Sequence, residues 1–327
     1  MIADELTRSV ISWYPGATGV TGATKLSGGA SQETWSFDIV HASGNVGAIL
    51  RRAPRGYGAA PTRAAGLDAE AQLMQLAFEA GLPSPRVLHV LRPADELGTG
   101  FVMQRVAGET IARKILRDAQ FAEARPKLAR QLGRIAAGIH ALPRAKLPQL
   151  RQMTAAKEIG ELEREYRSLD WPKPVFELAL RWLGDHDPGP ADDVTLVHGD
   201  FRHGNLIIGP DGVRAVLDWE LAHLGDPMED LGWICVNSWR FGEIDKPVGG
   251  FGSREELFAG YESAGRKVDP ERVRYYEVMG TLRWGVMCGG MMRRFRTGPD
   301  HSMERAMIGR RASETEIDLL RLLAPRK

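Results

Sequence analysis

The chain has 327 residues, which fits two domains or one large unit of two lobes. Its 43 basic and 42 acidic residues leave a formal net charge of +1, so no overall field attracts nucleic acid or an anionic membrane, and we expect neither as a partner. The two cysteines are too few for a disulfide scaffold, and they do not form the Cys-x-x-Cys pair of a thiolate zinc ribbon.

The start of the chain, Met-Ile-Ala-Asp-Glu, has neither the basic nor the apolar region of a secretory signal. The apolar stretches further along are all shorter or more interrupted than the ~20 residues that cross a bilayer. We therefore expect a cytoplasmic protein in which Cys235 and Cys288 are reduced and mostly buried.

The N-terminal third is predicted to be rich in strands. A short amphipathic helix over 4–14 is followed by runs of β-branched and aromatic residues bounded by turn residues. These runs predict strands at 24–26, 34–40, 46–51, 83–91 and 100–104. Apolar residues at helical spacing predict one helix in this segment, over 68–79.

After Gly108 the apolar spacing becomes helical. Helices are predicted over 110–115, 122–142, 156–166 and 175–183, and through most of the chain after Leu231. We therefore expect an α+β protein of two lobes. A β-rich lobe over 1–106 is joined near 104–109 to a larger, mainly helical lobe over 107–327.

The densest chemistry lies at a predicted β-hairpin. Two apolar runs, 206–208 and 213–217, flank the turn sequence Gly-Pro-Asp-Gly. Asn205 precedes the first strand and Asp218 follows the second, so both lie at the open end, where paired strands are ~4.8 Å apart. An amide oxygen and a carboxylate at that spacing can share one Mg²⁺ ion, with phosphates supplying its other ligands.

A third polar residue, Asp200, lies five positions before Asn205. The intervening loop can fold its carboxylate over the same opening and place an acceptor for a hydroxyl proton beside a metal–phosphate centre. Phosphoryl transfer needs that set of parts. The alternative is a metal cluster of His198, Asp200 and His203, but no second His, Asp or Glu set at a recognised spacing supports it.

The sequence His198-Gly199-Asp200-x-x-x-x-Asn205, followed by Asp218-Trp219-Glu220, resembles the aminoglycoside phosphotransferase family. The resemblance covers roughly residues 20–240 and implies a bilobed protein-kinase-like fold with ATP and Mg²⁺ as cofactors. It makes Asp200 the catalytic base, and Asn205 and Asp218 the Mg²⁺ ligands. His198 is then a structural residue that braces the loop. The downstream Asp226 and Asp230, which also match the family, are taken as structural.

The same resemblance places a nucleotide site in the β-rich lobe. A turn containing Gly28, Gly29 and Ser31 is expected to cover the phosphates, although it is neither a P-loop nor the G-x-G-x-x-G of protein kinases. Glycines there let the backbone approach phosphate oxygens closely. Without the rest of the pattern, this turn would be read as an ordinary hairpin.

Further nucleotide contacts follow from the resemblance. Arg51 takes the place of the phosphate-binding lysine, with the neighbouring Arg52 as the alternative for that role. Glu70, on the predicted helix, is expected to pair with this cation. In the connector, Gln104 and Val106 are expected to bind adenine through their backbone groups.

Charge near the C-terminus indicates which kind of molecule accepts the phosphoryl group. Between Gly280 and Arg311 the chain carries seven arginines and two acidic residues. This suits an anionic acceptor and opposes a polycationic drug; a solvated helix face or an oligomer contact is the other interpretation. The sequences over 49–54 and 198–227 are similar to kinase domains that occur with acyl-CoA dehydrogenases, some of which are associated with hydroxyacyl-CoA phosphorylation.

The sequence thus predicts an ATP- and Mg²⁺-dependent O-phosphotransferase that acts on a small-molecule hydroxyl, with a hydroxyacyl-CoA or another anionic metabolite as the hypothesis. An aminoglycoside-modifying kinase and a non-catalytic pseudokinase are the alternatives. The pseudokinase has only the replacement of lysine by Arg51 in its favour. A protein kinase ranks last, because the chain lacks an Ala-Pro-Glu segment and a long activation loop after Asp218. The oligomeric state stays open.

Overall fold

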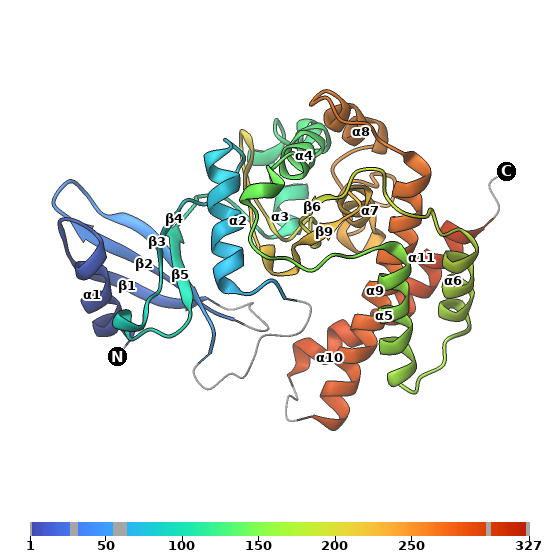
Figure 1. Ribbon diagram of the computed structural model, residues 1–327, viewed down its shortest axis with the longest axis horizontal. Coiled ribbons are helices and arrows are strands. Elements are labelled where there is room, and N and C mark those ends of the chain that lie inside the picture. The colour runs from blue at the N-terminus through green and yellow to red at the C-terminus, as the bar shows by residue number, and fades with distance from the viewer. Residues whose placement is uncertain (1, 27–31, 55–63, 299–301, 325–327) are drawn as a thin grey trace.

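The computed structural model describes residues 2–26, 32–54, 64–298 and 302–324, and it has two lobes (Figure 1). The N-terminal lobe is an antiparallel sheet with two helices, and the C-terminal lobe is mainly helical. The predicted α+β fold with a β-rich first lobe and a helical second lobe is therefore confirmed.

The sheet of the first lobe contains five strands in the order β1-β2-β3-β5-β4. Their bounds are β1 Ala17–Leu26, β2 Glu33–His41, β3 Val46–Arg52, β4 Val87–Val90 and β5 Gly100–Gln104. β1 begins well before the predicted 24–26, because its Thr, Gly and Ala residues carry no apolar alternation and only the pairing with β2 makes them a strand. β4 is shorter than the predicted 83–91.

The two faces of this sheet serve different cores, since successive side chains of a strand point to opposite faces. On one face, Leu50 of β3 packs with α1 (Ile2–Trp13) in a small core of its own. On the other face, Ile49 and Met103 join the large core that runs through α2 (Leu67–Glu79) into the second lobe. One face of the sheet therefore continues into the core of the helical lobe.

The second lobe is built around one long helix, α9, of 28 residues. Its helices are α3 Ala112–Arg117, α4 Arg125–His140, α5 Ala155–Ser168, α6 Pro174–Asp185, α7 Met228–Cys235, α8 Arg254–Glu262, α9 Pro270–Thr297, α10 Met303–Gly309 and α11 Ala312–Leu323. Two short strand pairs accompany them: β6 Thr195–Val197 with β9 His223–Gly225, and β7 Leu206–Gly209 with β8 Gly212–Val216.

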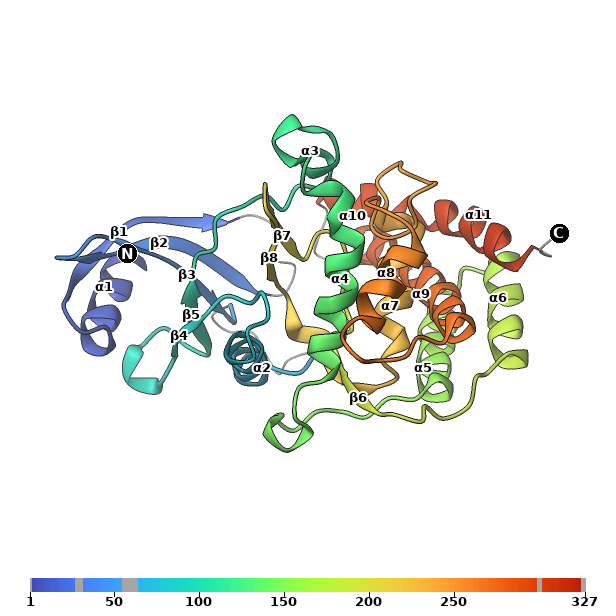
Figure 2. The ribbon, with the colours of Figure 1, turned by 90° about the horizontal axis from the view of Figure 1, so that it is seen from above.

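The predicted hairpin is present as β7 and β8, and it lies between the lobes (Figure 2). The connector after β5 is tied to it, because Glu109 and Ile208 exchange backbone hydrogen bonds of 2.9 and 3.0 Å. Cys235 and Cys288 are buried and unbridged, as expected. Along the described part of the chain, every helix is too short or too polar to cross a bilayer.

Helices α4 and α8 pack at glycines. A Cβ atom at Gly133 of α4 would collide with the carbonyl oxygen of Leu257, and one at Gly260 of α8 would collide with the carbonyl oxygen of Arg130. The two backbones therefore approach more closely than any larger side chain permits. This contact fixes α4, whose last residue, His140, reaches the candidate site.

We expect Gly133→Ala to lower the free energy of unfolding by about 1–3 kcal/mol, because the added methyl overpacks a backbone contact. The control is Gly184→Ala in α6, where nothing lies within 4 Å of the new Cβ. There alanine should stabilise by about 0.5–1 kcal/mol through its helix propensity. Urea unfolding of both variants measures the pair, and equal midpoints would contradict this packing.

Candidate active site

Asp200 lies in the loop between β6 and β7, where three side chains hold its carboxylate. Oδ1 accepts hydrogen bonds from Arg202 Nε at 2.9 Å and Trp233 Nε1 at 2.8 Å. Oδ2 accepts from Asn205 Nδ2 at 2.6 Å. Burial by itself would raise the pKa of Asp200, but the Arg202 charge and the Trp233 hydrogen bond outweigh it and lower that pKa. The carboxylate is therefore ionised at neutral pH.

Asn205 and Asp218 meet at the open end of the hairpin, as the sequence predicts. The backbone N–H of Leu217 donates to the carbonyl of Asn205 at 2.8 Å and closes that end. The amide nitrogen of Asn205 also bonds the Asp200 carbonyl at 3.0 Å, so the amide oxygen is its remaining ligand atom. Asp218 has a left-handed backbone with φ of 67°, which a non-glycine residue adopts only at a cost. The fold thus enforces the place of this carboxylate.

A buried carboxylate, Asp230 of α7, holds the backbone of the loop. It accepts the backbone N–H groups of His198 at 2.8 Å and Gly199 at 3.0 Å. It is also bonded to His140 Nε2 at 3.0 Å. Burial favours the neutral acid, but these hydrogen bonds outweigh it and lower the pKa of Asp230. Because its side chain is fully buried, a structural role fits this residue.

His198 braces the loop from within. Its Nδ1 accepts the backbone N–H of Asp200 at 3.2 Å, so its Nε2 carries the proton and donates to the Leu217 carbonyl at 3.1 Å. Burial lowers the pKa of His198 below its usual value. A neutral, fully bonded imidazole ties the Asp200 loop to the strand that ends before Asp218. Among the described residues, no set of three or more His, Cys, Asp or Glu side chains is arranged to hold a metal ion, so the structure gives no support to a His198–His203 cluster.

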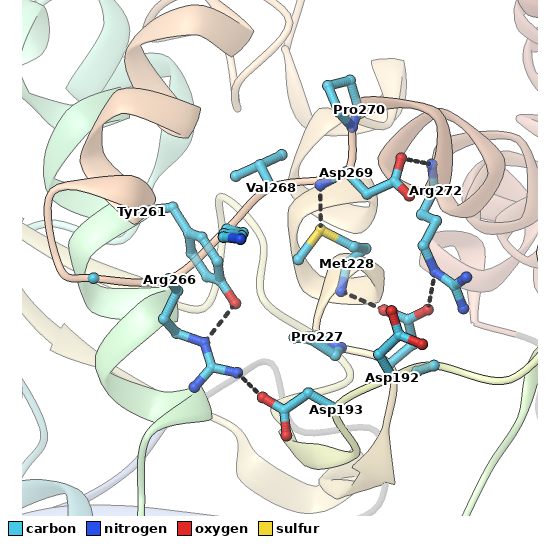
Figure 3. A pocket seen from close by; sticks show the side chains of 14 residues that line it. Asp192, Asp193, Pro227, Met228, Tyr261, Arg266, Val268, Asp269, Pro270 and Arg272 are labelled. Carbon is cyan, nitrogen blue, oxygen red and sulfur yellow. Dashed lines mark hydrogen bonds and ion pairs between the residues drawn. The ribbon is translucent and has the colours of Figure 1, made fainter.

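Asp226 belongs to a different part of the lobe. Its carboxylate accepts from Arg272 Nε at 2.8 Å and from the Met228 backbone N–H at 2.9 Å. Both partners lie at the wall of an open cavity of 680 Å³ (Figure 3). On the opposite wall, Arg266 bonds the Tyr261 hydroxyl at 3.0 Å and Asp193 at 2.6 Å. The arginines of this cavity are engaged by the protein, which fits a structural role for Asp226.

Arg283 requires a correction. It counts among the arginines that the sequence assigns to an anionic acceptor, but the structure buries it. Its guanidinium bonds Glu158 at 2.9 Å, Glu229 at 3.1 Å and the carbonyl of Gly199 at 3.1 Å. A buried guanidinium needs such partners, because desolvation penalises an unpaired charge. Arg283 therefore supports the Asp200 loop.

In the first lobe, Arg51 and not Arg52 points to the opening. Arg51 Nη2 bonds Asp218 Oδ1 at 2.6 Å, and its Nε lies 3.1 Å from Glu70 Oε1. Arg52, one residue further along β3, faces the other way and bonds Glu33 at 3.0 Å. The alternation of strand side chains thus separates the two arginines.

Three carboxyl groups surround Arg51, those of Glu70, Asp218 and Glu220. Glu220 adds a third carboxylate, 3.5 Å from Arg51 Nη2. Burial raises the pKa of Glu70 to about 8, and although Arg51 opposes this, the neighbouring Asp218 and Glu220 charges add to it. Because a pKa of about 8 leaves Glu70 mostly protonated at neutral pH, the ionised carboxylates that face Arg51 are Asp218 and Glu220.

A cavity of 360 Å³ lies beside this cluster, between the lobes. Apolar side chains form most of its wall: Leu26, Ile49, Met74, Met103, Ile207 and Leu217. Gln104 and Val106 also line it, as the sequence predicts for an adenine site. The backbone N–H of Gln104 donates to the carbonyl oxygen of Arg86 at 2.8 Å. A contact from the Gln104 backbone to a base would therefore use the carbonyl oxygen of Gln104. Gly28, Gly29 and Ser31 lie outside the described residues.

Sequence reasoning missed Trp233, Arg202 and the supporting role of Arg283. Arg202 had a usable signal, since it lies two positions after Asp200 in the same loop. Trp233 had none, because 33 positions separate it from Asp200 and an apolar helix face is the ordinary place for a tryptophan.

A family model described as "Phosphotransferase enzyme family" matches residues 22–273. Among curated proteins, acyl-CoA dehydrogenase family member 10 of Mus musculus is 29% identical over 58% of this chain and 18% of its own length, and member 11 of Gallus gallus is 28% identical over 66% and 28%. This chain thus spans less than a third of those relatives. Streptomycin 3''-kinase of Streptomyces griseus is 29% identical over 68% of this chain and 82% of its own length.

Solved structures show the same fold. A proposed aminoglycoside phosphotransferase of Ralstonia eutropha has a TM-score of 0.74 and 21% identity, covering 98% of this chain and 97% of its own. Aminoglycoside phosphotransferase APH(4)-Ia, in a ternary complex with AMP-PNP and hygromycin B, has a TM-score of 0.64 and 18% identity over 99% and 100%. The bilobed kinase-like fold expected from the sequence is therefore shared with these proteins.

We expect Asp230→Asn to lower the free energy of unfolding by about 3 kcal/mol or more, because an amide offers one acceptor oxygen where three donors meet and turns an N–H toward a donor. Asp185→Asn is the control, since Asp185 is exposed and 3.8 Å from Arg181; its effect should stay within about 0.5 kcal/mol. Urea unfolding measures both variants. A similar midpoint for the two would show that the buried carboxylate does not hold the loop.

Proposed function

The chain belongs to the phosphotransferase enzyme family, and on that premise we propose that it transfers the γ-phosphoryl group of ATP to a hydroxyl group of a small molecule. The observation that carries this proposal is the ionised Asp200 carboxylate held at one opening with Asn205, Asp218 and Arg51. The streptomycin kinase match and the AMP-PNP complex of a structural neighbour support the choice of reaction and of nucleotide.

In this reaction the acceptor oxygen forms a bond to the γ-phosphorus. The bond from that phosphorus to the bridging oxygen breaks, and ADP leaves with the electron pair. The hydroxyl proton passes to Asp200, which orients the acceptor before transfer and receives the proton as the new bond forms.

Asn205 and Asp218 would hold a Mg²⁺ ion through the amide oxygen and the carboxylate. The oxygen ligands fit that ion, and the Asp218 carboxylate places negative charge at the opening. When bound, Mg²⁺ neutralises charge that develops on the phosphates. Glu70 would orient the guanidinium of Arg51, which would pair with phosphate oxygens.

The 360 Å³ cavity is proposed to hold the adenosine of ATP, with its apolar wall against the base. Gln104 and Val106 would meet the base edge through their backbone groups. The turn with Gly28, Gly29 and Ser31 follows the Leu26 end of the cavity wall in the chain, and we propose that it covers the phosphates.

The acceptor is proposed to be anionic, and a hydroxyacyl-CoA is the leading hypothesis. Apart from the buried Arg283, the segment between Gly280 and Arg311 has six arginines: Arg293, Arg294 and Arg296 on the last turns of α9, Arg305 on α10, and Arg310 and Arg311 between α10 and α11. Two of them are engaged by the protein, since Arg293 bonds the Ser168 carbonyl at 2.6 Å and Arg311 pairs with Glu314 at 3.1 Å. The similarity to acyl-CoA dehydrogenase family members 10 and 11 points the same way.

An aminoglycoside kinase is the second candidate, because the streptomycin kinase match spans 82% of that enzyme. The six arginines oppose a polycationic acceptor. A pseudokinase is disfavoured, because the proposed base and both metal-binding residues are present and placed together.

We expect Asp200→Asn to bind ATP with unchanged affinity but to lower kcat for phosphotransfer by about 100-fold or more, since the proton acceptor is lost. Asp211→Asn is the matched control, because Asp211 is exposed in the hairpin turn and pairs only with Arg214 among the described residues. Isothermal titration with a non-hydrolysable ATP analogue and a coupled ADP assay give the two readouts. Full turnover by the Asp200 variant would remove Asp200 from the mechanism.

We expect wild-type protein to phosphorylate hydroxyacyl-CoAs and to leave aminoglycosides unchanged when both are offered with Mg²⁺ and ATP. Hydroxy acids, sugars and choline-like alcohols complete the panel, and mass spectrometry identifies the phosphorylated product. Turnover should fall as salt is raised, because screening weakens attraction between an anionic acceptor and surface arginines. Turnover of aminoglycosides alone would reverse the choice of acceptor and leave the reaction class intact.

A further inference from the structure

A buried indole donates directly to the proposed base. Trp233 of α7 is 3% exposed, and its Nε1 lies 2.8 Å from Oδ1 of Asp200. The guanidinium of Arg283 lies 3.9 Å from the centre of the indole ring, and Trp239 lies 5.2 Å away, centroid to centroid. The ring is therefore confined by its neighbours, and its N–H has a fixed direction.

The two oxygens of Asp200 are occupied unequally. A carboxylate oxygen accepts about two hydrogen bonds. Oδ1 already accepts from Trp233 and Arg202, whereas Oδ2 accepts from Asn205 alone among the described residues. The position still available for an acceptor hydroxyl is therefore on Oδ2.

We propose that Trp233 is a positioning residue for phosphotransfer: with Arg202 it occupies Oδ1 of Asp200, so that Oδ2 is the oxygen that receives the hydroxyl proton. This inference rests on the proposed function. Rotation about the Cβ–Cγ bond of Asp200 would exchange the two oxygens, and the fixed indole N–H opposes that rotation.

Helix α7 contacts both the backbone and a side chain of the Asp200 loop. Asp230 and Trp233 are three residues apart on α7, a spacing that places them on one helix face. Asp230 binds the backbone N–H groups of His198 and Gly199, and Trp233 binds the side chain of Asp200.

The two donors to Oδ1 of Asp200 differ in exposure, because Arg202 has a quarter of its side chain exposed whereas Trp233 is buried. The indole is thus the donor that solvent does not compete for.

The kinetic test compares two tryptophans of one aromatic cluster. Trp233→Phe removes the N–H donor and keeps an aromatic ring. Trp284→Phe makes the same change in volume, but the buried Nε1 of Trp284 bonds no partner in the described part of the chain. We expect Trp233→Phe to lower kcat about 10- to 100-fold, the range of a hydrogen bond to a charged group, with KM for ATP unchanged. Trp284→Phe should retain the wild-type kcat.

A spectroscopic test needs no phosphate acceptor. In ¹⁵N-tryptophan-labelled protein, the eight tryptophans give indole N–H signals that single Phe variants assign. We expect Asp200→Asn to move the Trp233 signal and to leave the Trp284 signal in place, because only the first donates to the lost charge. The spectra also report whether each variant folds.

The outcomes separate the two proposals. An unmoved Trp233 signal in Asp200→Asn, or equal kcat values for the two Phe variants, overturns the positioning role. Wild-type protein that transfers phosphate to no acceptor overturns the proposed function, and the indole signals then decide the Trp233–Asp200 contact by themselves. A shifted signal together with a kcat loss confined to Trp233→Phe supports both.

Discussion

The carboxylate of Asp230 is the constraint on which the site depends. It lies fully buried on α7 and satisfies the two backbone N–H groups that lead into Asp200. A loop must turn sharply there to bring its side chains back over the hairpin, and its N–H groups would otherwise be buried without partners. His140, the last residue of α4, is hydrogen-bonded to the same carboxylate. Its imidazole therefore links the packing of α4 against α8 to the site.

Charge is arranged differently on the two sides of the opening. On the side of the second lobe, Asp200 is surrounded by donors, and its carboxylate is stabilised in the charged form. On the side of the first lobe, Arg51 faces the carboxyl groups of Glu70, Asp218 and Glu220. One side therefore keeps a carboxylate ionised, and the other side sets a guanidinium among carboxyl groups. We propose that phosphoryl transfer uses both environments.

Much of the candidate site was predictable, because its residues are close in sequence. Asp200, Asn205 and Asp218 follow from one loop and one hairpin whose turn residues specify the pairing. Arg51 was harder to separate from Arg52, because a strand end presents both, and only the packing of α2 on one face of the sheet decides which side chain meets the opening. The start of β1 at Ala17 was missed, since its half-exposed residues carry no alternation.

The sequence by itself determined the lobes, the hairpin and the polar residues at its open end, because each depends on local periodicity, turn chemistry and short spacing. Only the tertiary structure decided which distant side chains serve that end. Arg283 is buried and donates to the carbonyl of Gly199, and the indole N–H of Trp233 donates to Asp200. Both contacts join segments far apart in the chain, and such contacts are set by how helices pack around the loop, which no local pattern encodes.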